Sequence, residues 1–229
     1  MRHSDGRLHA AAAVRGPLPL WQEQKLSEVA VVGSVAACNV PALTARLRRH
    51  CVGSERELCR LERTLRSTLP DRAGDQAEPG LREVRLYSDL HEKRSVLRVE
   101  SRDRLTVGHV AKARETPCVQ ARNVTQVPIG ASADDFLRSL GFAQTHEVLR
   151  RGRSFRRGLV LVSIYQICAA ADRSDEAAWS TLDEGGLFVV EAVAAGEQLK
   201  PLVEEIDEWA DMLEQASVAL APASSTGNR

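Results

Sequence analysis

The stretch FAQTHEVLRRGRSFRRGLVLVSIYQIC, which runs from Phe142 to Cys168, contains the strongest β-strand pattern in the chain. Gly152 and Gly158 divide it into three candidate strands. Large apolar side chains occupy both faces of the last of these, 159–168, which indicates that both faces are covered. Because glycine adopts turn conformations without steric cost, Gly152 and Gly158 predict tight turns or bulges between consecutive antiparallel strands.

Short-period apolar patterns on either side of this stretch predict further strands. Strands that are joined by short turns favour antiparallel pairing. Seven or more of them close into a barrel or pack as two sheets, because exposed strand edges must be protected. The expected fold class is therefore α+β and β-dominated. The further strands are expected at 26–35, 84–86, 97–99, 105–110, 119–127 and 187–193.

Two helices are predicted between the strand-rich segments. One follows the first strand, where Asn39 is a candidate N-cap and the apolar residues after it recur at helical spacing. The other is a short middle helix that starts at Ser132 and stops at Gly141. Its buried face is expected to contain Leu137 and Leu140.

The segment 197–220 is the clearest helix in the sequence. Its apolar residues form one stripe, which predicts that this amphipathic helix packs on the β-rich body. Its acidic residues are expected to cover the opposite face. The stripe contains Leu199, Leu202, Val203, Ile206, Trp209, Ala210 and Leu213, and the acids are Glu204, Glu205, Asp207, Glu208, Asp211 and Glu214.

The segment from Ser54 to Ser67 supports two interpretations. Ser54 and Glu57 resemble a capping box, and three leucines follow at helical spacing, which predicts a second helix. The family resemblance described below favours a strand instead. Both interpretations stay open at this point.

Three segments have little apolar surface to bury and are predicted to be unstructured. They are an N-terminal tail at 1–20, a flexible loop at about 68–80 and a C-terminal tail at 221–229. The remaining length, 21–220, suits a single domain with a sizeable core.

The composition excludes several classes of function. Thirty-one basic residues balance 31 acidic residues. A neutral chain argues against general nucleic-acid binding, because phosphate neutralisation needs a basic excess. The longest apolar run, 159–171, is too short and too polar to span a bilayer. Five cysteines without a Cys-x-x-Cys pair favour a reducing compartment over a disulfide framework.

No motif predicts a catalytic, cofactor or metal site. The pair His146-Glu147 would fit a zinc protease only with a second histidine at position 150, which is Arg150. We therefore interpret His146 as a strand residue held by hydrogen bonds. Cys51 and Cys59 have no assignable histidine partner and are interpreted as buried structural cysteines.

A charge-lined barrel also suggests a metal-dependent triphosphatase of the tunnel type. Such enzymes carry Glu-x-Glu-x-Lys on their first strand, because a hard cation needs several carboxylate oxygens. The first predicted strand here has a single acid, Glu28. This activity is therefore disfavoured and is kept as the alternative function.

One dense basic run follows His146. We interpret it as solvated positions around a hairpin in preference to a phosphate-binding surface. The acidic C-terminal helix is its expected internal partner. The run contains Arg150, Arg151, Arg153, Arg156 and Arg157.

Several stretches together resemble the family of subunit 18 of the Mediator complex, a component of its head module. The resemblance covers about residues 26 to 215, with gaps, and is most specific in 132–168. A terminal strand, 189–193, and the C-terminal helix complete the family's order of elements. The matching residues are Gly33-Ser34-Val35, Leu43 to Cys51, Arg122-Asn123-Val124, Asp135-Phe136-Leu137, Leu140-Gly141-Phe142, His146-Glu147, Gly152, Phe155-Arg156, Gly158 and Tyr165.

The resemblance implies a closed antiparallel β-barrel, similar in shape to the tunnel triphosphatases but without catalytic function. It implies a nuclear scaffold that pairs with Mediator subunit 20, binds a helix of subunit 8 and takes part in RNA polymerase II transcription. The resemblance implies no catalytic residue, no cofactor and no metal site for this chain. A third possibility is an unrelated β-rich binding module.

Physical roles are expected for the residues of the shared hairpin motif. Gly141 is expected in a turn, like the two glycines discussed above. Phe142 and Phe155 are expected in the core or an interface, with the core preferred. Arg156 is expected to pair with an acid across the hairpin, with Glu147 as the candidate.

Overall fold

The computed structural model describes residues 24–68, 83–104, 118–130, 133–170, 179–182 and 186–222. The predicted tail at 1–20, nearly all of the predicted loop at 68–80 and most of the predicted tail at 221–229 lie outside these residues. The strand expected at 105–110 and the expected helix cap Ser132 also lie outside them.

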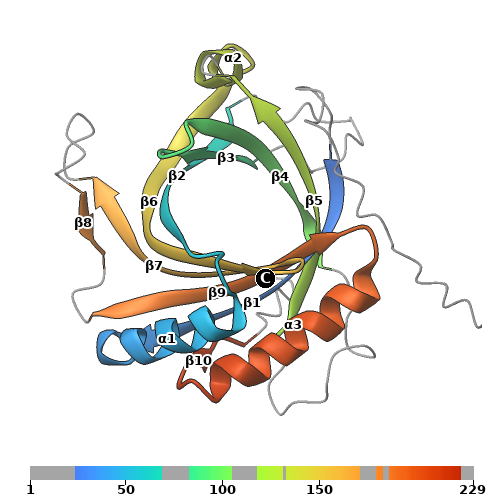
Figure 1. Cartoon of the computed structure of the whole chain (residues 1–229). Coiled ribbons are helices and arrows are strands. Elements are labelled where there is room, and N and C mark those ends of the chain that lie inside the picture. The colour runs from blue at the N-terminus through green and yellow to red at the C-terminus, as the bar shows by residue number, and fades with distance from the viewer. Residues whose placement is uncertain are drawn as a thin grey trace, which may run out of the picture.

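Eight strands close into an antiparallel barrel (Figure 1). Around the barrel the order is β1-β5-β4-β3-β2-β6-β7-β9, and β9 pairs with β1 to complete the ring. The expected fold class is thereby confirmed. The described strands are β1 Gln24–Ala36, β2 Arg56–Ser67, β3 Glu83–Asp89, β4 Arg94–Arg104, β5 Gln120–Ile129, β6 Phe142–Arg157, β7 Val160–Ala170, β8 Trp179–Thr181, β9 Leu187–Gly196 and β10 Ala219–Leu220.

Gly152 does not form a turn, so that prediction was wrong. Strand β6 continues through it, and Gly152 pairs with Tyr165 on β7. A Cβ atom at this position would lie 2.0 Å from the carbonyl oxygen of Ile164. Glycine is therefore required here because the two strands approach closely, while the real turn is at Gly158, where φ is +58°.

The segment from Ser54 to Ser67 forms a strand, so the helix prediction was wrong. Buried residues come in adjacent pairs along β2, such as Leu58 with Cys59 and Thr64 with Leu65. Because neighbouring strand residues point to opposite faces, both faces of β2 are buried. Apolar residues on both faces produce the three- and four-residue spacing that resembles a helix.

The three expected helices are present, with corrected ends. The Asn39 side chain makes no capping hydrogen bond at the first helix. In the middle helix Leu137 is buried, but Leu140 is 47% exposed because it lies where the chain turns at Gly141. The last helix ends at Glu214. The described helices are the short 3-10 helix η1 Ala37–Asn39, α1 Val40–His50, α2 Ala133–Ser139 and α3 Leu199–Glu214.

Strand β10 lies beyond α3, inside the segment expected to be helical. It pairs with Gly33 and Ser34 of β1. A Cβ atom on Gly33 would lie 2.7 Å from the carbonyl oxygen of Ala219. This contact explains why β1 carries glycine at the point where the C-terminal strand returns to it.

The main hydrophobic core lies outside the barrel wall, between the wall and two helices. Helices α1 and α3 cover one side of the barrel beside β1 and β9 (Figure 1). The predicted stripe of α3 faces this core, and Asp207, expected on its solvent face, is only 1% exposed. The core includes Val29, Val31, Leu43, Leu47, Phe155, Val160, Val162, Val190, Leu202, Ile206, Trp209 and Leu213.

None of the helices in the described part of the chain has the length and apolar character needed to cross a membrane.

Replacing Gly152 with alanine should destabilise the fold. The new methyl group would overlap backbone atoms of β7, which cannot rotate away as a side chain does. We expect a loss of about 2–3 kcal/mol in the free energy of unfolding, measured by denaturant titration. Gly130→Ala is the matched control, because a Cβ atom there meets nothing within 4 Å. Equal stability of the two variants would contradict the close approach.

Candidate functional site

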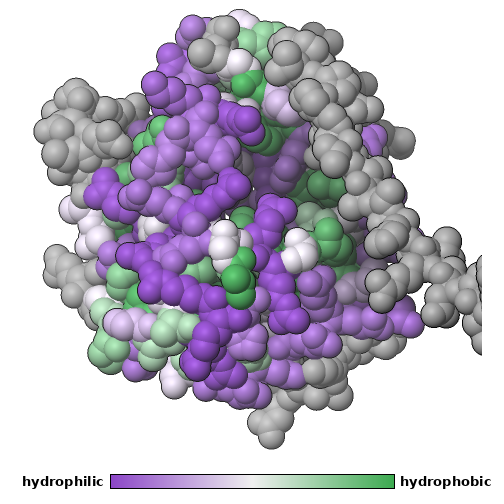
Figure 2. Space-filling view, in the orientation of Figure 1, coloured by the Kyte–Doolittle hydropathy of each residue, from purple (hydrophilic) through white to green (hydrophobic). Residues whose placement is uncertain are grey.

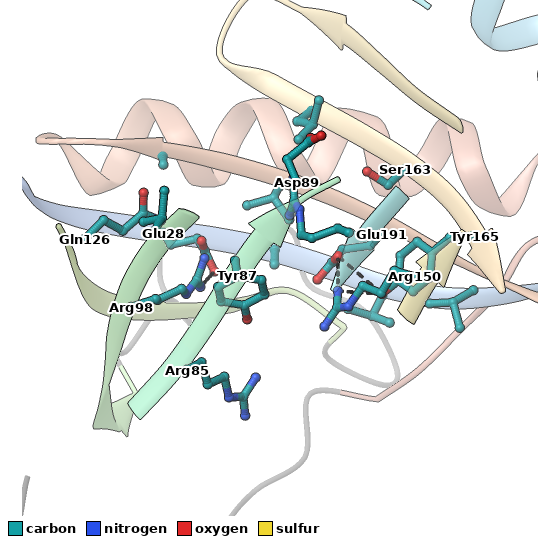
Figure 3. A pocket seen from close by; sticks show the side chains of 18 of the residues that line it. Glu28, Arg85, Tyr87, Asp89, Arg98, Gln126, Arg150, Ser163, Tyr165 and Glu191 are labelled. Atoms are coloured by element: carbon teal, nitrogen blue, oxygen red, sulfur yellow. Dashed lines mark hydrogen bonds and ion pairs between the residues drawn. The ribbon is translucent and has the colours of Figure 1, made fainter. Parts of the chain in front are cut away.

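The barrel encloses a cavity of about 950 Å³ that is lined by all eight strands. Figure 3 shows polar side chains from different strands converging in it. Figure 2 shows mainly hydrophilic residues on the described surface around the opening, with hydrophobic residues in the recess beside them. The cavity is the place where a ligand or a catalytic centre would be sought.

Every strand of the barrel contributes a polar side chain to one continuous set of contacts, which we call the inner network. Alternation along each strand turns these side chains inward while their neighbours face the outer cores. The members are Glu28 of β1, Arg122 of β5, Arg98 and Glu100 of β4, Arg85 and Tyr87 of β3, Glu62 of β2, Arg150 of β6, Tyr165 of β7 and Glu191 of β9.

Two arginines hold Glu28 at one end of the inner network. Arg98 donates to its Oε1 at 2.6 Å and Arg122 donates to the same atom at 2.8 Å. Both arginines also bind Glu100, at 2.9 and 2.6 Å. Burial by itself would raise the pKa of Glu28, but Arg98 and Arg122 outweigh it and hold this pKa below its ordinary value.

Arg85 bridges the two halves of the inner network. Its Nη1 lies 3.6 Å from Glu100 and 3.4 Å from Glu62. Tyr87 donates from its hydroxyl to Glu62 at 3.5 Å. Burial raises the pKa of Tyr87, and the negative charge of Glu62 raises it further, so this hydroxyl stays protonated at neutral pH.

Arg150 is the centre of the other half. It contacts Glu62 at 2.6 Å and Glu191 at 3.1 Å, and it donates to the Tyr165 hydroxyl at 2.9 Å. Burial would lower the pKa of Arg150, but these partners raise it, so the guanidinium stays charged. Burial and the nearby Glu191 raise the pKa of Tyr165.

Four glutamates and four arginines of the inner network cancel each other's charge. Each glutamate is already bound to at least one guanidinium, so none offers a free carboxylate to a cation. Within the ranges the structure describes, no group of three or more His, Cys, Asp or Glu side chains is arranged to hold a metal ion. Glu28 is the acid of β1 in the network, as the sequence indicated.

The predicted motif residues do not gather into one site. Gly141 has φ of +83° in the turn before β6, as expected, and Phe142 packs on the outer cluster beneath α2. His146 is an exposed strand residue whose Nδ1 lies 3.2 Å from Thr145 Oγ1. Phe155 is fully buried in the main core.

The predicted pairing of Arg156 with Glu147 was wrong. Glu147 binds Arg63 at 2.6 Å, and Arg156 lines the cavity instead of crossing to it. The basic run is divided between the two faces of β6: Arg150 points into the barrel, where it binds Glu191, and Arg153 binds Glu55 outside it.

The inner network was not predicted from the sequence. A usable signal was present, because charged residues alternate with buried apolar ones in the middle of several strands. Arg85 stands between Val84 and Leu86, and Arg98 stands between Leu97 and Val99. A charge at such a position indicates an interior that is polar and paired. Cys51 and Cys59 are buried, as expected, and burial raises the pKa of the Cys51 thiol.

Replacing Arg150 with methionine should destabilise the protein strongly. The change leaves Glu191 without its guanidinium partner and Glu62 with only the longer contact to Arg85 at 3.4 Å, which costs about 3–5 kcal/mol in the free energy of unfolding. Arg48→Met is the matched control, because the Arg48–Glu55 pair is exposed and its loss should change the stability little. Similar losses in both variants, measured by denaturant titration, would contradict a buried network.

Glu28 should make stability sensitive to acid. Its pKa is lowered in the folded state, so its contribution is present above about pH 4.5 and is lost as the pH falls through the lower folded-state pKa. We expect Glu28→Gln to flatten the fall in Tm between about pH 4.5 and pH 3 relative to the native chain. Glu204→Gln, on the exposed face of α3, serves as the control. Parallel Tm profiles for the native chain and Glu28→Gln would contradict this assignment.

The comparisons with known proteins find similarity in structure and not in sequence. No protein-family model and no curated protein matches the chain. A chain of the Schizosaccharomyces pombe Mediator head module matches with a TM-score of 0.64 and 14% identity, over 85% of this chain and 97% of that one.

Two further structures share the architecture. A candidate adenylate cyclase from Vibrio parahaemolyticus matches with a TM-score of 0.55 and 12% identity, over 86% of this chain and 94% of that one. A protein from Pyrococcus horikoshii matches with a TM-score of 0.53, the same identity and the same coverage. At these identities the similarity is one of fold: the chain has a Mediator-like closed barrel.

Proposed function

We propose that this chain is a non-catalytic scaffold subunit of the Mediator head module, of the subunit 18 type, which acts in the nucleus in RNA polymerase II transcription. One observation carries the proposal. The barrel and helices match a chain of a Mediator head module over 97% of that chain's length. The motif series from Asp135 to Gly158 runs through α2 and β6 to the turn before β7.

The chemistry of the barrel interior supports a scaffold. An enzyme that binds a metal-triphosphate needs carboxylates that are free to bind the cation. Here Glu28, Glu62 and Glu191 are each held by arginine at 2.6 to 3.1 Å. Removing such a carboxylate from its arginine would leave buried charges unpaired, so the network favours a structural role.

Partners follow from the family resemblance. We infer a heterodimer with Mediator subunit 20 and a bound helix of subunit 8. Protein partners of this kind need a rigid surface, and the closed barrel with its outer layer of α1 and α3 supplies one.

Affinity capture tests the proposal. The tagged chain, expressed in its own organism, should recover Mediator subunits from nuclear extract, with subunits 8 and 20 foremost, as identified by mass spectrometry. Gly130→Ala should recover the same set, and Gly152→Ala should lose it, because only the second change disturbs the barrel wall. Recovery of the native chain alone, or with an unrelated assembly, would overturn the proposal.

The triphosphatase alternative is tested separately. We expect no phosphate release from nucleoside triphosphates with Mn²⁺ or Mg²⁺ above the rate of the blank, because the inner carboxylates are bound to arginine. Release that depends on Glu28 and disappears in Glu28→Gln would instead support the enzyme.

A further inference from the structure

One wall of the cavity is mostly apolar, although the inner network reaches into it. Strands β1, β7 and β9 lie side by side where the barrel closes, and most of their side chains in the cavity lining are apolar. We call this wall the apolar strip. Its residues are Ala30, Val32, Leu161, Ile167, Val189, Val193 and Ala195, with Leu159 from the turn before β7. The polar residues that these strands add to the lining are Glu28, Ser163, Tyr165 and Glu191.

The apolar strip faces a charged wall. In the ring of eight strands β2 lies opposite β1, and β3 lies opposite β9. The charged wall includes Arg60 and Tyr87, with the Arg60 guanidinium 5.8 Å from the centre of the Tyr87 ring. The cavity is therefore mostly apolar on one side and mostly charged on the other.

Positive charge at one end of the cavity is not cancelled. Arg60 and Arg156 line the cavity, and neither has a carboxylate partner among the residues that the structure places. Arg156 lies at the end where β2 begins and β6 ends, because Arg56 of β2 pairs with Ser154 of β6, and Arg60 lies further inside, in the half of β2 nearer that end and in register with Arg150. We call this end the basic rim.

Two acids also belong to the rim, and both are engaged. Asp89 pairs in register with Arg60, but its Oδ1 accepts the backbone N–H groups of His91 and Glu92 at 3.0 and 2.9 Å. Glu92 binds Arg56 at 3.1 Å and lies 3.7 Å from Arg94. The rim therefore keeps donors that are available to an anion.

We propose that the barrel cavity binds a small anionic amphiphile, whose apolar body lies on the apolar strip and whose phosphate or carboxylate head is held at the basic rim. A cavity of about 950 Å³ suits a small molecule. Arginine is suited to both head groups because its planar fork matches two oxygens. The site needs no metal ion and goes beyond the scaffold role.

Calorimetric titration of the purified full chain tests the site. Dodecyl phosphate and dodecanoate, kept below their micelle concentrations, carry the two head groups on one tail. One of them or both should bind with one molecule per chain. Dodecyltrimethylammonium, dodecyl maltoside and inorganic phosphate should bind at least about tenfold more weakly, because each lacks the anionic head or the apolar body.

Variants locate the site. Arg60→Gln with Arg156→Gln should weaken binding of the anionic amphiphile about tenfold or more. Val193→Phe, which fills part of the apolar strip, should also weaken it. Arg49→Gln, at an exposed position of α1 outside the barrel, should leave binding unchanged. Thermal melts of each variant verify that the fold is kept.

Three results would overturn the proposal. They are no binding of either anionic amphiphile by the native chain, equal binding of the cationic and anionic tails, and equal weakening by Arg49→Gln and by the rim variants. These results are independent of affinity capture, so the ligand site and the scaffold role fail separately.

Discussion

The rest of the structure depends on one constraint, a set of largely buried ion pairs and hydrogen bonds that takes at least one residue from every strand of the barrel. Charges in such a place are tolerated only when they are paired with good geometry. The pairs therefore specify the register of all eight strands together. A slip of one residue between two strands would turn the charges outward and the apolar side chains inward. The interior contributes specificity to the fold more than it contributes stability.

Because the interior is polar, the apolar cores must form on the outside of the wall. The largest one lies beneath α1 and α3, and a smaller one lies beneath α2. This arrangement explains why the longest helix has a full apolar stripe although the body it covers is a barrel. It also gives the protein a rigid outer layer, and it leaves a cavity inside in which charged and apolar walls face each other.

The elements that the sequence predicted well are those whose pattern is local. Each of these elements has a stripe or a continuous run of apolar residues that is recognisable in its own sequence, without knowledge of its neighbours in the fold. They are the strands β1, β7 and β9 and the helices α1 and α3. Strand β2 was ambiguous because it is buried on both faces. The role of Gly152 depends on the backbone of another strand. The ion pairs of the inner network could not be predicted because they also depend on distant strands: Glu28 binds Arg98 and Arg122, which are 70 and 94 residues away in the sequence.

Strand β1 precedes the other described strands in the sequence, yet its partners are β5, β9 and β10, and none of these begins before Gln120. On the ribosome its edges therefore stay uncovered until half of the polypeptide has emerged, and the ring closes only after β9 is complete. Such long-range pairing is slow and exposes sticky edges to other nascent chains. Folding of this protein in the cell should therefore depend on chaperones that cover the unpaired edges of β1. Translation that stops before β9 should yield aggregates and not a partly folded product.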